Sequence, residues 1–409
     1  MFFIFYEHVF LVRGLNKYMI HDFNKKKLYE VSLEIGDILT MLTRGQSTQE
    51  IAWIFNISSQ DLEEHLRNFQ ERSIGFLSDH FIRNEESIWE FLKIKEKINK
   101  KLIDFAWCEL TSRCNLECIH CSCSGSPLTT HANDFKVNFF DVVKQIRDLG
   151  CDKIQFTGGE PMLRKQLLID LIKYSSSLGF SYREIYSNLN LLDDDLLRII
   201  TEYQLNIATS IYGHNAKIHD AVTTVQGSFD KTINSLRKLQ QANINIRVGI
   251  ILMDINLPYK RDILKFVKSM EISNVKVDIV RNAGRGCALF DTETKSAKIN
   301  SNSGFGNLSL KEDFFWRSHL AHNCFSNHIC INEDGNVFPC VMLRESLGNL
   351  ENDSLYNIIV KDESQKLRNL TKDKVDKCSL CELRYVCFDC RIDRKDQSFL
   401  SQSLCSRYF

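Results

Sequence analysis

The sequence lacks an excess of either charge: its 409 residues carry 52 lysines and arginines against 52 aspartates and glutamates. A balance of zero gives no reason to expect a nucleic acid or an anionic membrane as a partner. Long hydrophobic runs are also missing, since no stretch approaches the roughly 20 apolar residues of a membrane span. The apolar start, Phe2–Val12, is short, is interrupted by Glu7 and His8, and has no basic leader. It therefore does not resemble a signal peptide, and we expect a cytoplasmic protein.

Cysteine, by contrast, is abundant, with 15 residues. This number would suit disulfides in a small secreted protein, but the chain is long and has no predicted signal peptide, so we expect reduced, metal-binding cysteines. Eleven of them fall into two groups. The first group is Cys114, Cys118 and Cys121. The second group is Cys324, Cys330, Cys340, Cys378, Cys381, Cys387, Cys390 and Cys405.

Both groups have a spacing that suits iron–sulfur ligation. Three thiolates leave one iron of a 4Fe–4S cluster without a protein ligand, so a substrate or cofactor can bind it. Zinc is the alternative, but a structural zinc ion takes four ligands, and His120 is adjacent to Cys121 and poorly placed for the same ion. The eight thiolates of the second group can close two further clusters, since each takes about four cysteines. Two zinc ribbons are the alternative for this group.

The first 82 residues are predicted to form a small domain of three strands followed by three helices, an order that resembles a winged helix. The strands are Phe2–Val12, Tyr18–Asp22 and Lys27–Val31, and the helices are Leu33–Thr43, Thr48–Phe55 and Ser59–Arg72. Ser47 and Ser59 are predicted N-caps. Helix Ser59–Arg72 contains about as many acidic as basic residues, which disfavours a role in DNA binding. A groove beside an edge strand can instead take an extended peptide.

From Ile103 onwards strands and helices alternate, which predicts a parallel sheet with right-handed crossovers. About six such units make an α/β fold, an incomplete barrel with its chemistry at the carboxyl ends of the strands. The strands are Phe105–Thr111, Lys153–Thr157, Arg183–Ser187, Asn206–Ile211, Ile244–Leu252 and Val275–Val280. The helices are Phe139–Leu149, Lys165–Leu178, Asp193–Tyr203, Phe229–Gln241 and Tyr259–Met270.

The remaining segments complete a predicted organisation of five parts. Residues 1–82 form the front domain, 83–101 a charged linker helix, and 102–287 the barrel. Residues 288–322 form a polar bridge, and residues 323–409 a cysteine-rich domain that depends on metal for its fold because it has little core of its own.

The run from Arg113 to Cys121, whose cysteines are separated by three and then two residues, resembles the signature of radical S-adenosylmethionine (SAM) enzymes. Gly158, Gly159 and Glu160 follow the second strand, as the GGE motif of that family does. The resemblance implies a 4Fe–4S cluster on the three cysteines and SAM as the second cofactor. It also implies that the Gly158–Glu160 segment binds the methionine amino group, where two glycines let the backbone approach the ligand closely.

Polar residues at the ends of later strands extend this resemblance. Ser187 ends the third strand and Ser210 the fourth, where the family holds the ribose and carboxylate of SAM. The segment 281–286, which includes Gly284, Arg285 and Gly286, resembles an element that the family places near the adenine. The sequence identifies no catalytic side chain.

Residues 324–405 resemble the SPASM extension of radical SAM enzymes, which carries two auxiliary 4Fe–4S clusters. The resemblance implies that one cluster is held by Cys324, Cys330, Cys340 and Cys390, and the other by Cys378, Cys381, Cys387 and Cys405. Four cysteines remain. Cys108 and Cys151 are expected in the core, whereas Cys123 and Cys287 lie near functional segments.

The three parts together resemble the maturases of ribosomally made peptides, and the start of the chain resembles the grasp-with-spasm type. The resemblance implies a partial (β/α)6 barrel with a front domain that grips the leader of a precursor peptide. A 5′-deoxyadenosyl radical would abstract hydrogen, an oxidative thioether or carbon–carbon crosslink would follow, and the electron donor would be of the flavodoxin or ferredoxin type.

Two alternatives stay open. Sulfatase-maturing enzymes, which form formylglycine, resemble this chain in core and extension, but they carry an aspartate directly after the equivalent of Cys340, where this chain has Val341. An iron–sulfur redox sensor that binds DNA through its winged helix is the second alternative. A sensor would not need the SAM-binding residues Gly158–Glu160 and Ser210.

Overall fold

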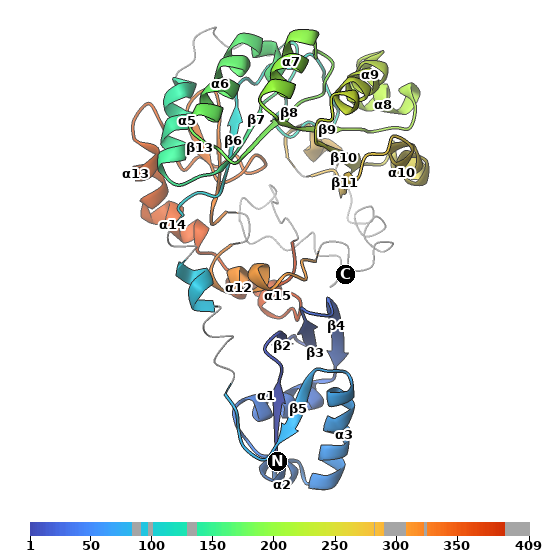
Figure 1. Cartoon of the computed structure of the whole chain (residues 1–409), viewed down its shortest axis with the longest axis vertical. Coiled ribbons are helices and arrows are strands. Elements are labelled where there is room, and N and C mark those ends of the chain that lie inside the picture. The colour runs from blue at the N-terminus through green and yellow to red at the C-terminus, as the bar shows by residue number, and fades with distance from the viewer. Residues whose placement is uncertain are drawn as a thin grey trace. The chain divides into compact units, whose positions relative to one another are not determined.

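The computed structural model describes residues 1–83, 91–96, 101–128, 137–281, 283–289, 308–322 and 325–388. The chain divides into two compact units, which we describe separately. The front unit combines Met1–Lys100, Phe305–Asn323 and Asn369–Cys390. The barrel unit combines Lys101–Gly304, Cys324–Arg368 and Arg391–Phe409. Each unit is therefore assembled from segments that are far apart in the sequence (Figure 1).

The barrel unit is built on the predicted parallel sheet, and its α/β fold is confirmed. The six strands pair in sequence order, each parallel to the next. They are β6 Phe105–Glu109, β7 Lys153–Thr157, β8 Tyr182–Tyr186, β9 Asn206–Ser210, β10 Ile246–Leu252 and β11 Asn274–Ile279. The helices between them are α5 Phe139–Asp148, α6 Lys165–Ser177, α7 Asp194–Glu202, α8 Ala216–Thr223, α9 Ser228–Gln241 and α10 Lys260–Ser269. The prediction missed α8 and otherwise differed by one or two residues at most ends.

Three short strands extend this sheet beyond β6. β12 (His328–Ile331) pairs parallel to β6, and β13 (Asn336–Phe338) and β14 (Gly348–Asn349) follow in antiparallel order. The sequence prediction contained none of them. They are followed by helices α13 (Leu355–Val360) and α14 (Asp362–Arg368). The first of the described C-terminal cysteines, Cys330, is consequently a residue of the barrel sheet itself.

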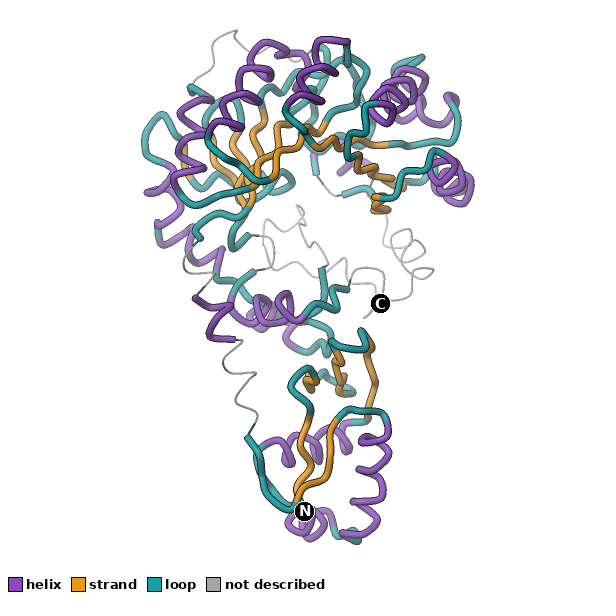
Figure 2. The backbone as a smooth tube through the Cα atoms, viewed as in Figure 1, coloured by secondary structure: helices purple, strands orange, loops and turns teal. Residues whose placement is uncertain are grey.

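The helices of the barrel unit lie along the outer side of the sheet (Figure 2). Their apolar sides form one continuous core with the strands, in which Val143, Ile154 and Leu168 are fully buried. Burial of such side chains contributes about 1.5–3 kcal/mol each. The inner side of the strands is thereby left for polar residues and a cavity.

The front unit contains the predicted order of strands and helices, with two corrections. The single predicted strand Phe2–Val12 is two strands, β1 (Phe2–Phe5) and β2 (Val9–Arg13), because a turn in which Val9 N donates to Tyr6 O at 3.0 Å separates them. β2 forms a three-stranded antiparallel sheet with β3 (Tyr18–Asp22) and β4 (Lys27–Val31). β1 instead pairs with β5 (Gly75–Ser78), a strand that the prediction missed.

The helices of the front unit begin at polar caps. They are α1 Leu33–Thr43, α2 Thr48–Phe55 and α3 Ser59–Glu71. Ser47 caps α2 as predicted, and Glu50 completes a capping box. The predicted cap Ser59 is wrong: Ser58 is the N-cap of α3, since its hydroxyl accepts from the backbone of Gln60 and Asp61.

Helix α12 (Glu312–Leu320) and helix α15 (Asp376–Ser379) also belong to the front unit. A second core joins them to the small sheet: it contains Met19 and Phe23 from the sheet side, Phe315 from α12, and Leu383 and Tyr385 from the segment after α15. Among the residues that the structure describes, no helix is long and apolar enough to cross a membrane.

Candidate active site

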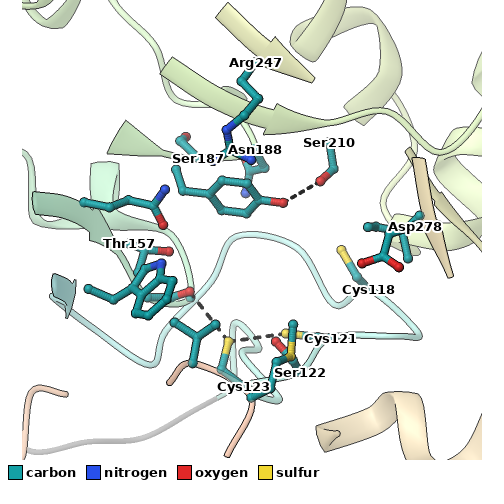
Figure 3. A pocket seen from close by; sticks show the side chains of 18 of the residues that line it. Cys118, Cys121, Ser122, Cys123, Thr157, Ser187, Asn188, Ser210, Arg247 and Asp278 are labelled. Carbon is teal, nitrogen blue, oxygen red and sulfur yellow. Dashed lines mark hydrogen bonds between the residues drawn. The ribbon is translucent and has the colours of Figure 1, made fainter. Parts of the chain in front are cut away.

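A cavity of about 780 Å³ lies inside the barrel unit, on the inner side of the parallel strands. Its wall includes Cys114, Cys118 and Cys121 from the loop after β6, which we call the cysteine loop (residues 112–126). Figure 3 shows Cys118, Cys121 and Cys123 on this loop below the strand ends that carry Ser187, Asn188 and Ser210. The structure thus brings the first cysteine group and two predicted serines to one cavity.

The three thiols of the cysteine loop are largely withdrawn from water. Burial raises the pKa of Cys114 to about 12 and raises that of Cys118 as well, and repulsion from neighbouring cysteines adds to both shifts. A hydrogen bond with Cys123, whose sulfur lies 3.5 Å from that of Cys121, lowers the pKa of Cys121 to about 6. Three thiolates are a donor set that suits an iron–sulfur cluster. In this structure the three side chains line one cavity but are not grouped tightly enough to hold a metal ion, so their assignment as cluster ligands stays a prediction.

Two glycines let the backbone after β7 pass directly over the cysteine loop. Gly158 has a φ of +139°, and a Cβ there would lie 2.3 Å from the carbonyl oxygen of Thr111. A Cβ on Gly159 would lie 2.1 Å from the carbonyl oxygen of Arg113. Gly159 N donates to Thr111 O at 2.6 Å and Glu160 N donates to Arg113 O at 2.8 Å. Both glycines line the cavity.

The Glu160 carboxylate does not belong to the cavity wall but is fully buried behind it. It accepts hydrogen bonds from Ser187 Oγ at 2.8 Å, Asn188 N at 2.9 Å and Met162 N at 3.0 Å. Burial raises the pKa of Glu160 to about 7 despite these donors. In this arrangement Glu160 fixes the end of β8, where Ser187 and Asn188 face the cavity.

Asn188 connects this strand end to the cysteine loop. Its side-chain amide donates to Asn115 Oδ1 at 2.8 Å and lies 3.7 Å from Cys114 Sγ. Sequence reasoning noted only that Asn188 ends a strand. Its contact with a cysteine 74 positions earlier depends on the close approach of two strand ends, which single-sequence patterns do not reveal.

The sequence-based prediction also missed a buried polar network in the cavity wall. Glu184 on β8 is 2% exposed and forms a two-point ion pair with Arg247 on β10, with N–O distances of 2.7 and 3.2 Å. Tyr182 donates to the same carboxylate at 2.7 Å. The Arg247 guanidinium lies 5.8 Å from the ring centroid of Tyr186, whose hydroxyl lies 2.7 Å from Ser210 Oγ. The charged residues within the predicted strands, Glu184 and Arg247, were the sequence feature that could have indicated this network.

A second ion pair joins the sheet to the segment after Cys340. Arg344 contacts both oxygens of Glu109, the last residue of β6, at 2.6 and 2.7 Å. Cys330 and Cys340 lie in this part of the barrel unit and both are buried. The positive charge of Arg344 partly offsets the burial that raises the pKa of Cys330.

The remaining C-terminal cysteines divide as follows. Cys378, Cys381 and Cys387 lie in the front unit, whereas Cys324, Cys390 and Cys405 lie outside the described residues. Among the described residues, no three histidine, cysteine or acidic side chains are grouped tightly enough to hold a metal ion. The assignment of ligands to the two auxiliary clusters therefore stays a prediction.

Comparison with known families matches the two cysteine regions. Residues 108–267 match the Radical SAM superfamily, and residues 324–382 match SPASM, an iron–sulfur cluster-binding domain. The chain is 24% identical to an AdoMet-dependent heme synthase of Oleidesulfovibrio alaskensis over 324 residues, which is 70% of this chain and 81% of that protein. It is 25% identical to the antilisterial bacteriocin subtilosin biosynthesis protein AlbA of Bacillus subtilis, over 61% of this chain and 58% of AlbA.

Among solved structures, the chain resembles Streptococcus suis SuiB bound to the precursor peptide SuiA. The TM-score is 0.57 at 13% identity, and the likeness covers 94% of each chain. At this identity the likeness shows a shared fold.

Proposed function

This chain is a radical SAM enzyme with a SPASM domain, and we propose that it modifies a ribosomally made precursor peptide by an oxidative intramolecular crosslink. The observation that carries the proposal is the extent of the likeness to peptide-bound SuiB, which covers 94% of this chain. The likeness to AlbA, a protein of bacteriocin biosynthesis, supports the same substrate class.

The bound cofactors supply the radical chemistry, in which an electron from the cluster cleaves SAM and the resulting 5′-deoxyadenosyl radical abstracts a hydrogen atom. The chain's own residues hold and orient the reactants. Cys114, Cys118 and Cys121 would hold the cluster, and SAM would bind beside them against the Gly158–Gly159 backbone, which lines the same cavity. The polar groups of Ser187 and Ser210 face the same cavity and would fix the ribose and carboxylate.

A crosslink removes two hydrogens from the peptide. The first leaves as a hydrogen atom, and the second leaves as a proton and an electron when the new thioether or carbon–carbon bond forms. The auxiliary clusters expected on the C-terminal cysteines can accept this electron.

The test is an anaerobic reaction with SAM, dithionite and a candidate precursor, a short peptide from a reading frame next to this gene. We expect 5′-deoxyadenosine and a peptide lighter by two hydrogen atoms, with fragmentation locating the link. Cys118→Ala is the matched control and should abolish both products. SAM cleavage with an unchanged peptide mass would contradict the proposal.

A second candidate follows from the heme synthase likeness, which covers 70% of this chain. The same preparation can be offered a tetrapyrrole precursor of heme in place of the peptide, with heme detected by absorbance. Conversion of the tetrapyrrole would replace the peptide proposal. The sulfatase-maturing alternative is disfavoured because Val341, which lines the cavity, cannot act as a base.

A further inference from the structure

The segment after β11 docks against the back of the cysteine loop. Gly284 has a φ of +56°, and a Cβ there would lie 2.3 Å from Cys121 O and 2.4 Å from Ser122 O. A Cβ on Gly286 would lie 3.3 Å from His120 O. Only residues without side chains allow two backbones to approach this closely. The residue between these two glycines, Arg285, is therefore held directly over the loop.

Arg285 donates three hydrogen bonds to carbonyl oxygens of the cysteine loop. Its backbone N donates to Cys121 O at 2.9 Å, its Nε to Cys118 O at 2.8 Å, and its Nη2 to Gly125 O at 2.8 Å. The three acceptors span eight residues of a loop that has neither helix nor strand. The planar side chain thus joins the backbone at Cys118 to that at Gly125, and the backbone N of Arg285 adds a contact at Cys121 between them.

The charge of Arg285 is also available to the site. Among the described residues it forms no ion pair with a carboxylate, unlike Arg247 and Arg281, which are paired with Glu184 and Asp278. An unneutralised guanidinium beside a cluster stabilises its reduced form, which carries one more negative charge.

We propose that Arg285 is a positioning residue that holds the cysteine loop in its cluster-binding shape and that its charge favours reduction of the bound cluster. Loop shape and charge are separable. Arg285→Lys keeps the charge but lacks the planar fork that joins the Cys118 and Gly125 carbonyl groups, whereas Arg285→Met removes both the fork and the charge.

The first experiment is a reductive titration of the reconstituted full chain, followed by electron paramagnetic resonance. The cluster of interest is the one whose signal changes when SAM is added. We expect Arg285→Met to lower the fraction of chains that give this SAM-responsive signal. The same variant should shift the midpoint potential of this cluster to a more negative value. Arg285→Lys should lower the fraction while leaving the potential close to that of the wild type. Arg198→Met, at an exposed position on α7, is the control and should change neither.

The second experiment needs no cluster. Hydrogen exchange of the iron-free chain should show faster exchange in residues 115–125 for Arg285→Met and Arg285→Lys, with β7 and β8 unchanged. A wild-type exchange rate, signal fraction and potential in Arg285→Met would overturn the proposal. Because neither experiment uses a peptide, the result does not depend on the proposed substrate.

Discussion

At the scale of single residues, the buried carboxylate of Glu160 gives the chain a pH-dependent stability. Its pKa is raised to about 7 by burial, above the ordinary value of 4.5. The folded state then holds a proton that the unfolded chain releases, so this contribution is fully present below pH 4.5 and is lost as the pH rises to about 7. The shift corresponds to roughly 3 kcal/mol.

We expect Glu160→Gln to remove this pH dependence, since an amide does not titrate. Urea unfolding of the iron-free chain at several pH values between 4.5 and 7.5 measures it. The wild type should lose stability across this window more steeply than the variant. Parallel curves would show that Glu160 titrates as it does in the unfolded chain.

The ion pair between Glu109 and Arg344 leads to a second residue-scale prediction. Both side chains are mostly buried, at 10% and 20% exposure, so Arg344→Met would leave a carboxylate without its partner. Breaking a buried pair in this way costs about 3 kcal/mol. The exposed pair of Lys238 with Asp194 is the control, and Lys238→Met should cost less than about 1 kcal/mol. Denaturant midpoints that fall equally in both variants would refute this difference.

At the scale of elements, the sequence pattern predicted the six parallel strands because each is a short segment with buried apolar residues that lies between segments of helical periodicity. It could not place β12, since a four-residue strand in a cysteine-rich region pairs with β6 more than 200 positions earlier. Helix α8 was missed although Asn215 caps it, with Oδ1 accepting from Ile218 N at 3.1 Å. Local sequence patterns were therefore sufficient to predict the parallel strands of the barrel. They were not sufficient to predict β12, whose position depends on pairing with a strand that is distant in the sequence.

The residues of the candidate site also fall into two kinds, those that local spacing could predict and those that depend on long-range contacts. Spacing predicted Cys114, Cys118 and Cys121 as ligands of one cluster, and the structure places all three in the wall of one cavity. Arg285 lies 160 or more positions from the carbonyl groups that it contacts, and only its neighbouring glycines indicated a close backbone approach.

The turn at Gly158 allows a prediction about an element boundary. With φ at +139° and a Cβ position 2.3 Å from Thr111 O, Gly158→Ala requires the backbone to move. Gly179 also has a positive φ, +73°, but nothing lies within 4 Å of its Cβ position. We expect Gly179→Ala to cost about 1 kcal/mol and Gly158→Ala about 3 kcal/mol, together with a loss of iron at the first cluster. Thermal unfolding and iron analysis would test this, and equal costs would contradict the steric argument.

At the scale of the whole molecule, each unit has its own core and draws on distant parts of the chain. The segment that carries Cys378, Cys381 and Cys387 packs within the front unit: Leu15 N donates to Leu380 O at 2.8 Å, and Arg384 Nη1 donates to Arg13 O at 2.7 Å. The front sheet and this cysteine segment should therefore gain and lose structure together.

Phe23 is the residue through which this coupling can be measured. Its ring is 7% exposed and lies 5.2 Å from that of Phe315 and 5.7 Å from that of Phe10. Phe23→Ala should cost about 3–4 kcal/mol because it leaves a cavity in the core of the front unit. Hydrogen exchange should then accelerate in β2, β3 and residues 376–388, while β7 and β8 keep their protection.

Phe156, fully buried on β7, provides the reciprocal variant. Phe156→Ala should accelerate exchange in β7 and β8 and leave residues 376–388 protected, because that segment shares no core with the barrel strands. If either substitution deprotects both regions equally, the chain unfolds as one cooperative body. The expected pattern, two separate responses, would mean that the three described cysteines of the front unit can lose their ordered surroundings while the first cluster site remains intact.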